Sequence, residues 1–169
     1  MYKHTFNYYL LEEHVPITKD ALKTIKQVPL EKDKNNPDMN LNSYHLTYSN
    51  PEENEQFKKY IGTQLELIFK KYNLTLKNCW VQKYLKNSYH SLHTHGLNYN
   101  EKSFVWFIEG DEKSSPTIFY DVGFPYVNTQ QSISFKFVPG TLLIFPGFLP
   151  HEVVPNKNNK RLIVSGNVF

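Results

Sequence analysis

The sequence of 169 residues is poor in cysteine and in long apolar stretches. Its single cysteine, Cys79, cannot form an internal disulfide, and it excludes zinc or iron–sulfur sites that need several thiolates. No apolar run approaches the roughly 20 residues of a membrane-spanning helix. The N-terminal stretch lacks the apolar core and the cleavage site of a signal peptide. We therefore expect a protein of a reducing compartment, such as the cytoplasm, with no membrane partner.

Arginine is the other scarce residue. Lysine and arginine together number 19, and Arg161 is the only arginine among them. Because the chain uses lysine almost everywhere for positive charge, its one arginine suggests a special role, such as bidentate hydrogen bonding to a carboxylate. Chance is the alternative explanation. Because the net charge is only +3 and the lysines are dispersed, we expect no nucleic-acid partner.

Apolar residues are plentiful, at 40% of the chain, and aromatic residues make up 15%, which is enough for a packed core. In the first part, Thr18 is placed to cap a short helix that ends before Pro29. An apolar stripe with a period of about 3.6 residues predicts a longer helix over residues 50–72. Thr5–Leu11 is a candidate strand, and the polar stretch 31–42 is predicted to be a loop.

After residue 73 the pattern changes to short strands separated by turn signals. Pro139 and Gly140 fit a type II turn. Such strands are typical of an antiparallel sandwich or barrel. We predict a mainly β chain with N-terminal helices, folded as one domain in which residues 1–76 support a core of residues 77–169. The predicted strands are Cys79–Lys86, Ser103–Glu109, Thr117–Tyr120, Ser132–Val138, Thr141–Phe145, His151–Val154 and Arg161–Val168.

Histidines gather in the segment HSLHTHG, which contains His90, His93 and His95. Residues two apart in an extended segment project to one face, so His93 and His95 can reach one point, whereas His90 faces away unless the chain bends. A third ligand must come from elsewhere, and His151, which follows an apolar strand and a turn, is the best candidate. Three ligands on one side of a metal leave positions for substrate and oxygen, as in non-haem Fe(II) sites. The alternative is that these are packing or surface histidines.

Arg161 begins the last predicted strand, ten residues after His151. Strand alternation places Ile163, Ser165 and Asn167 on the same face as Arg161. If His151 lines a cavity, the neighbouring strand can point Arg161 into it, where a guanidinium binds a carboxylate through two parallel hydrogen bonds. The alternative is a surface arginine paired with an acidic neighbour.

In their order along the chain, these residues resemble the 2-oxoglutarate/Fe(II)-dependent oxygenase superfamily, in the style of its small phage and bacterial members. The resemblance covers roughly the C-terminal half of the chain. It rests on WVQKY (80–84), HTH (93–95), SFVWF (103–107), PGTLLIFP (139–146) followed by His151, and the terminal strand with Arg161 and Asn167. It implies a double-stranded β-helix, which is a cupin-like jelly roll, with Fe(II) as the metal and 2-oxoglutarate as cosubstrate.

By this resemblance His93, His95 and His151 hold the iron, and Arg161 binds a carboxylate of 2-oxoglutarate. His95 stands where the superfamily usually has aspartate. A neutral imidazole there leaves the metal with one negative charge less, which makes its binding weaker or more sensitive to pH. The alternative is that His95 lies beside an iron with only two protein ligands.

The resemblance also implies residues that touch the cosubstrate. Tyr84 and Gln82 lie at the spacing of an Asn-x-Tyr pair in related enzymes, with glutamine in place of asparagine. Ser165 and Asn167 share the face of Arg161 and are weaker candidates. Ile163 stands where a serine is usual, which removes one expected hydroxyl.

The implied activity is that of a dioxygenase. It hydroxylates a C–H bond of a peptide, an amino acid or another small metabolite and releases succinate and CO2. Two alternatives remain open. One is a cupin-like three-histidine metalloenzyme that does not use 2-oxoglutarate, and the other is a non-catalytic β-sandwich binding module.

Overall fold

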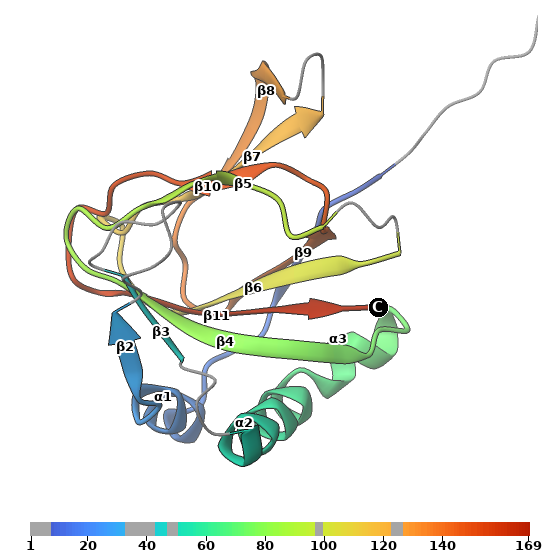
Figure 1. The fold of residues 1–169 in the computed structure, drawn as a ribbon, viewed down its shortest axis with the longest axis vertical. Helices are drawn as coiled ribbons and strands as arrows, with labels where there is room; N and C mark the ends of the chain where they lie inside the picture. The colour runs from blue at the N-terminus through green and yellow to red at the C-terminus, as the bar shows by residue number, and fades with distance from the viewer. Residues whose placement is uncertain (1–7, 33–42, 47–50, 97–99, 123–126) are drawn as a thin grey trace, which may run out of the picture.

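Two antiparallel sheets and a layer of helices stack on one another in the computed structural model, which describes residues 8–32, 43–46, 51–96, 100–122 and 127–169 (Figure 1). The strands are β1 (Leu11–His14), β2 (Leu30–Lys32), β3 (Ser43–Leu46), β4 (Leu76–Tyr84), β5 (His90–His93), β6 (Lys102–Glu109), β7 (Thr117–Val122), β8 (Val127–Phe135), β9 (Thr141–Pro146), β10 (His151–Val153) and β11 (Arg161–Val168). The helices are α1 (Lys19–Lys26), α2 (Pro51–Gln64) and α3 (Glu66–Lys71).

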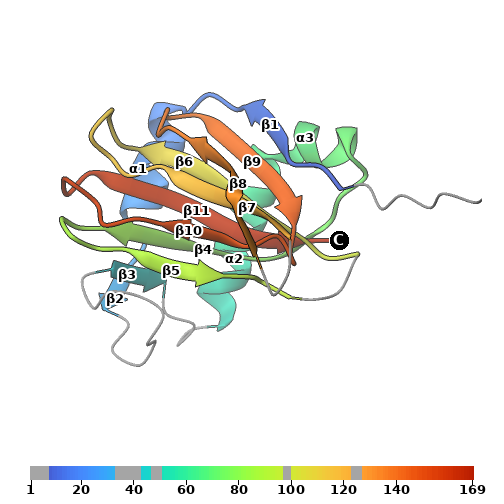
Figure 2. The same ribbon diagram turned by 90° about the horizontal axis from the view of Figure 1, so that it is seen from above.

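The strand order identifies the fold. The large sheet has the order β1-β9-β6-β11-β4-β3-β2, and the small sheet has the order β5-β10-β7-β8. From β4 to β11 consecutive strands alternate between the sheets, except at the β7–β8 hairpin. Figure 2 shows the small sheet lying over the middle of the large one. The predicted double-stranded β-helix, or jelly roll, is therefore confirmed.

The helices cover the outer face of the large sheet (Figure 1). Thr18 caps α1, since its Oγ1 accepts a hydrogen bond from the N–H of Ala21 at 3.0 Å. The single helix predicted over 50–72 is wrong, because the backbone leaves the helical region at Leu65, between α2 and α3. Apolar residues spaced four apart advance about 40° around a helix axis at each step, so in one continuous helix they would turn away from the sheet. The interruption at Leu65 offsets this drift, and Phe57, Leu65 and Phe69 stay buried in one core.

Two apolar cores result from strand alternation. One lies between the helices and the large sheet and includes Ile61, Trp106 and Val164. The other lies between the two sheets and includes Phe107 and Phe145. Residues that face the second core also face the interior of the jelly roll, where a ligand cavity can form. None of the helices within the described ranges is both long and apolar enough to cross a bilayer.

Turns follow the sequence signals more closely than strand ends do. Gly140 has a φ of 94°, and the N–H of Thr141 donates to the carbonyl of Val138 at 3.1 Å, as expected for a Pro-Gly type II turn. Asn73 takes a φ of 51° after α3. The N–H of Leu74 then reaches the carbonyl of Phe69 at 2.8 Å, which closes the helix end.

Several strand predictions need correction. The strand expected over Thr5–Leu11 starts only at Leu11, and residues 1–7 lie outside the described residues. The expected loop 31–42 begins with the last two residues of β2, and its remainder lies outside the described residues. β3 and β5 were not predicted, and β8 ends at Phe135 rather than at Val138. Short polar strands such as β5 carry no apolar alternation that could reveal them.

Cys79 on β4 provides a test of the helix-facing core. Its side chain is buried, and burial raises the pKa of the thiol to about 12. The thiol is therefore protonated at pH 8, and we expect no reaction with a thiol-specific reagent in the native protein. In urea the same reagent should modify one thiol per chain. Stoichiometric labelling of the native protein on mixing would contradict this packing.

Candidate functional site

A bulge in β5 arranges the histidine cluster. His151 on β10 pairs with His93, and Val153 pairs with His90, so two steps along β10 face three steps along β5. The extra residue turns His90 toward the side of His93, and their rings stack with centroids 3.6 Å apart. His90 was expected to face away unless the chain bends, and the bulge is such a bend, so His90 lies on the side of His93.

His93, His95 and His151 converge on one point. Each offers a ring nitrogen, and these atoms lie within 4.8 Å of one another. The Nε2 atoms of His95 and His151 are 3.2 Å apart. Two nitrogens each about 2.1 Å from one ion are about 3.0 Å apart at a right angle and about 3.4 Å apart at the tetrahedral angle. The spacing between these two rings therefore suits a single divalent cation.

Backbone carbonyls orient two of these rings. The Nδ1 of His93 lies 2.7 Å from the carbonyl oxygen of Ser91, and the Nδ1 of His151 lies 2.9 Å from that of Leu149. A ring that donates from Nδ1 carries its lone pair on Nε2, which is the tautomer that a metal requires. The N–H of His95 also donates to the carbonyl of Gly147 at 2.7 Å. That bond ties the HTH segment to the turn that precedes His151.

Burial keeps the imidazoles of His95 and His151 neutral. Burial and the neighbouring His93 lower the pKa of His95 to about 4. Burial also holds the pKa of His151 well below its usual range, and the other two histidines add to this effect. The rings of Phe119 and Phe145 pack against His151 with centroids 5.3 Å and 4.8 Å away. Neutral imidazole is the form that binds a metal, so no proton has to leave these two rings first.

Arg161 is completely buried and lies in the same interior as the histidines. Its Nε donates to the carbonyl of Ser115 at 3.0 Å, and its Nη2 donates to Oγ1 of Thr117 at 2.9 Å. Its Nη1 is buried and has no hydrogen-bond partner among the described residues. Within the described residues no carboxylate forms an ion pair with it. A buried donor of this kind is costly unless a ligand completes it, and a carboxylate is the best match.

Aromatic rings hold the guanidinium in place. Its Cζ lies 4.3 Å from the centroid of the Tyr84 ring, and Phe107 and Phe137 lie further out. Burial raises the pKa of Tyr84 to about 12, so its phenol stays protonated and can donate a hydrogen bond. Ser115 and Thr117 were not identified from the sequence, because single hydroxyl residues in a short strand carry no distinguishing signal.

The histidines and Arg161 line one narrow cavity between the sheets. Its free volume is about 20 Å³, which is room for a single water molecule. Gln82 and Tyr84 on β4 and Ser165 on β11 also face it, as the period of two predicts. The full lining is Trp80, Gln82, Tyr84, His90, His93, His95, Val105, Thr117, His151, Val153, Arg161, Ile163 and Ser165.

Asn167 does not line this cavity. Its side-chain oxygen accepts a hydrogen bond from Ser103, and its side-chain nitrogen donates to Oδ1 of Asn78 at 3.0 Å. Six residues of strand span about 20 Å, so β11 has run past the cavity at this position. The amide of Asn167 bridges β6 and β4.

His95 is the predicted ligand whose role most needs a test, because aspartate is more usual there. Replacing His95 with alanine should weaken Fe(II) binding at least about 100-fold if His95 is a direct ligand, since loss of a residue that only supports a ligand already costs about 10- to 100-fold. An anaerobic titration followed by calorimetry measures this. His14→Ala, at an exposed histidine on β1, is the matched control. Unchanged affinity in His95→Ala would mean that the metal is held by His93 and His151 alone.

Comparisons with known proteins agree with the fold. No family model matches the sequence, and no curated protein matches it. An oxidoreductase of the 2OG-Fe(II) oxygenase family from Burkholderia pseudomallei has a TM-score of 0.68 at 15% identity, over 94% of this chain and 84% of that chain. The viral collagen prolyl hydroxylase of Paramecium Bursaria Chlorella virus-1, in a 2OG complex, has a TM-score of 0.60 at 16% identity, over 95% of each chain.

A third similar structure contains ligands of interest. HygX from Streptomyces hygroscopicus, with nickel, 2-oxoglutarate and hygromycin B bound, has a TM-score of 0.66 at 9% identity, over 94% of this chain and 82% of that chain. At such identities the likeness establishes the fold. This chain has the fold of the 2OG-Fe(II) oxygenases, so the resemblance seen in the sequence is confirmed at that level.

Proposed function

We propose that this protein is an Fe(II)- and 2-oxoglutarate-dependent dioxygenase. One observation carries the proposal: a single cavity is lined both by three converging imidazoles and by a buried guanidinium whose Nη1 has no partner in the described part of the chain. A metal ion satisfies the first group, and a carboxylate satisfies the second. A cosubstrate that binds the metal at one end and carries a carboxylate at the other complements both.

In this proposal the histidines bind the metal and Arg161 binds the cosubstrate. His93, His95 and His151 hold Fe(II), and Arg161 binds the distal carboxylate of 2-oxoglutarate. When bound, Fe(II) and 2-oxoglutarate would supply, together with O2, the chemistry that hydroxylates a C–H bond: one oxygen atom of O2 goes to the product alcohol and the other to succinate, and CO2 is released. We assign Tyr84 and Gln82, which line the same cavity, to orienting the cosubstrate, and Ser165 to adding a hydroxyl beside them.

Water exclusion is the second task of the chain. The rings of Phe119 and Phe145 cover His151, and Tyr84 covers Arg161. In such surroundings a charged hydrogen bond to Arg161 is stronger than it is in water. The fork of Arg161 is already oriented by Ser115 and Thr117, so little side-chain freedom is lost when a carboxylate arrives.

The small cavity volume favours a second candidate function. A space for one water does not admit a dicarboxylic acid until some of the lining side chains turn aside. A cupin-like three-histidine metalloenzyme that does not use 2-oxoglutarate needs no such opening. Against it stands the unpaired Nη1 of Arg161, for which that alternative provides no partner.

Succinate formation separates the candidates. The protein is reconstituted with Fe(II) without oxygen, and 2-oxoglutarate and then air are added. The proposal predicts succinate only when both Fe(II) and 2-oxoglutarate are present. Tight Fe(II) binding without succinate supports the three-histidine alternative. A protein that binds neither Fe(II) nor 2-oxoglutarate overturns both and supports a non-catalytic module.

A further inference from the structure

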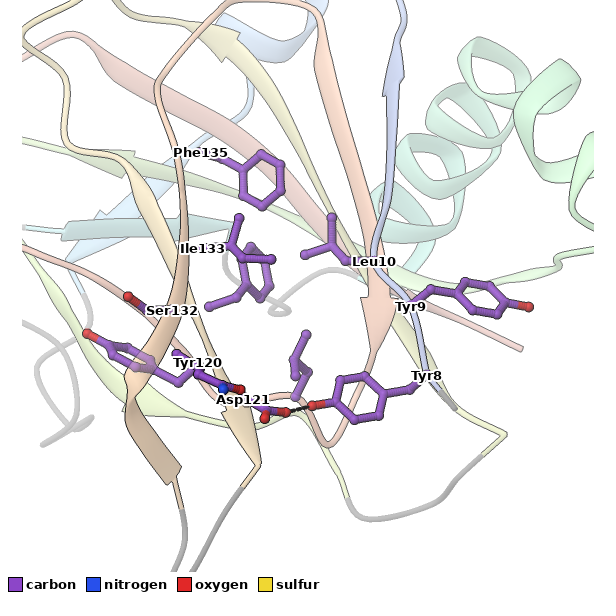
Figure 3. Close-up of a pocket in the computed structure, with 11 residues that line it drawn as sticks. Tyr8, Tyr9, Leu10, Tyr120, Asp121, Ser132, Ile133 and Phe135 are labelled. Carbon is purple, nitrogen blue, oxygen red and sulfur yellow. Dashed lines mark hydrogen bonds between the residues drawn. The ribbon is translucent and has the colours of Figure 1, made fainter. Parts of the chain in front are cut away.

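A second, larger cavity of about 600 Å³ opens between the β7–β8 hairpin and the segment that leads into β1 (Figure 3). Its walls are mostly apolar. Leu10, Ile133 and Phe135 face its interior, while Tyr9 and Tyr120 point away from it (Figure 3). The apolar lining consists of Leu10, Phe119, Ile133, Phe135 and Leu149, with tyrosines around the rim. An apolar hollow of this size is suited to the body of a small molecule or to a large side chain.

This apolar cavity adjoins the metal-binding centre through two shared residues. The Phe119 ring lines the cavity and is stacked against His151. Leu149 also lines the cavity, and its carbonyl accepts the hydrogen bond from Nδ1 of His151. A molecule in the cavity therefore contacts the residues that position His151.

The polar end of the cavity has one sign of charge. Asp121 is the only charged residue among the described residues that line it. The hydroxyl of Tyr8 donates to this carboxylate (Figure 3). The same hydroxyl accepts a hydrogen bond from the N–H of Val122 at 3.4 Å. A carboxylate offers about four acceptor positions, so Asp121 can accept more bonds than the one from Tyr8. A second carboxylate, that of Glu152, accepts a bond from the rim residue Tyr120.

Exposed apolar surface marks the same wall. Ile133 is 60% exposed although it lies on a strand and faces a cavity. A large aliphatic side chain in that position gains from being covered by an apolar ligand. The occupant that fits has a hydrocarbon body against Ile133 and Phe135 and a hydrogen-bond donor, best a cation, near Asp121. An anion lacks any positive partner among these lining residues.

We infer that this cavity binds the primary substrate, and that the substrate is a hydrophobic amine: an apolar body that carries a cationic or donor group toward Asp121. The inference rests on the proposed dioxygenase function and narrows its substrate class. The apolar body supplies the C–H bonds, and the amine selects the orientation.

Two probes with the same hydrocarbon body and opposite charge test the inference. 3-Phenylpropylamine and 4-phenylbutyrate, each a phenyl ring on three methylenes, are titrated separately into the 169-residue chain without metal, at low ionic strength, and heat is measured. We expect the amine to bind at least about tenfold more tightly, the usual effect of one charged hydrogen bond. Asp121→Asn should remove that preference. Ile133→Ser should weaken the binding of the amine, whereas Leu67→Ser, at an exposed leucine on α3, should not.

The outcomes distinguish this inference from the proposed function. Equal binding of both probes, a preference for the carboxylate, or an amine affinity unchanged by Ile133→Ser would overturn the inference. These titrations need neither Fe(II) nor 2-oxoglutarate, so they do not depend on turnover. If the amine binds as expected and no succinate forms in the reconstituted protein, the cavity is a hydrophobic-amine site and the dioxygenase function fails. If succinate forms and the amine does not bind, only the substrate class fails.

Discussion

Replacing His151 with alanine is expected to abolish Fe(II) binding and succinate formation while both sheets stay folded. Its Nε2 lies 3.2 Å from that of His95 and is held toward the centre by the bond to Leu149. Changing a residue that merely supports a metal ligand costs about 10- to 100-fold in affinity or activity. Loss of a ligand itself should therefore weaken Fe(II) binding at least about 100-fold. Anaerobic calorimetry measures the affinity, and circular dichroism checks the fold.

A second variant separates ligation from packing. His151 is enclosed by Phe119 and Phe145, so alanine also leaves a void. His151→Leu restores most of the apolar volume and provides no nitrogen. It should melt closer to the parent than His151→Ala does, and it should be equally unable to bind Fe(II). If His151→Leu binds Fe(II) as tightly as the parent, His151 is a packing histidine and the metal site is wrong.

The sequence predicts those parts of the site that depend on local strand geometry better than the parts that depend on pairing between distant strands. Alternation along β11 correctly predicts that Arg161 and Ser165 face the same way, and the resemblance contributes Tyr84 and Gln82 on β4; all four line the cavity. This works because the side-chain period of a strand is two whatever the rest of the fold does. Alternation does not say how far along the strand a cavity extends. Asn167 therefore faces the same side of β11 as Arg161 and still lies beyond the cavity.

Features that depend on strand pairing were out of reach. The bulge that turns His90 onto His93 arises from the register between β5 and β10, which are far apart in sequence. The break at Leu65 depends on how the helices lie on the sheet. The apolar cavity joins Tyr8 to Asp121 across 113 positions of sequence. Each of these features depends on contacts with distant segments of the chain, so local sequence propensity cannot predict it.

The convergence of the three histidines lies between these cases. The spacing of His93 and His95 indicates a shared face, and the position of His151 after an apolar strand makes it a candidate. Only the pairing of His151 with His93 brings the distant ring into place. The resemblance to a family contributed this step, because it supplied a known arrangement for strands whose pairing the sequence does not state.

Arg161→Lys should raise the apparent KM for 2-oxoglutarate by about 10- to 100-fold, the usual cost of one charged hydrogen bond. A lysine ammonium is a point charge and cannot imitate the fork that Ser115 and Thr117 hold in position. Because Arg161 is assigned to the far end of the cosubstrate, kcat should fall much less than kcat/KM. Succinate formation at a series of 2-oxoglutarate concentrations measures both.

Controls for this prediction must account for the burial of Arg161. Lys160→Arg, at the exposed neighbouring position, exchanges the same two side chains in the opposite direction and should leave KM unchanged. Thr117→Val keeps the guanidinium and removes only the acceptor of Nη2, so it should raise KM by a smaller factor. Fe(II) affinity should stay at the parent value in all three variants, since none of them changes a histidine. A KM for 2-oxoglutarate that is unaltered in folded Arg161→Lys would remove Arg161 from the cosubstrate site, and the three-histidine metalloenzyme would become the better explanation.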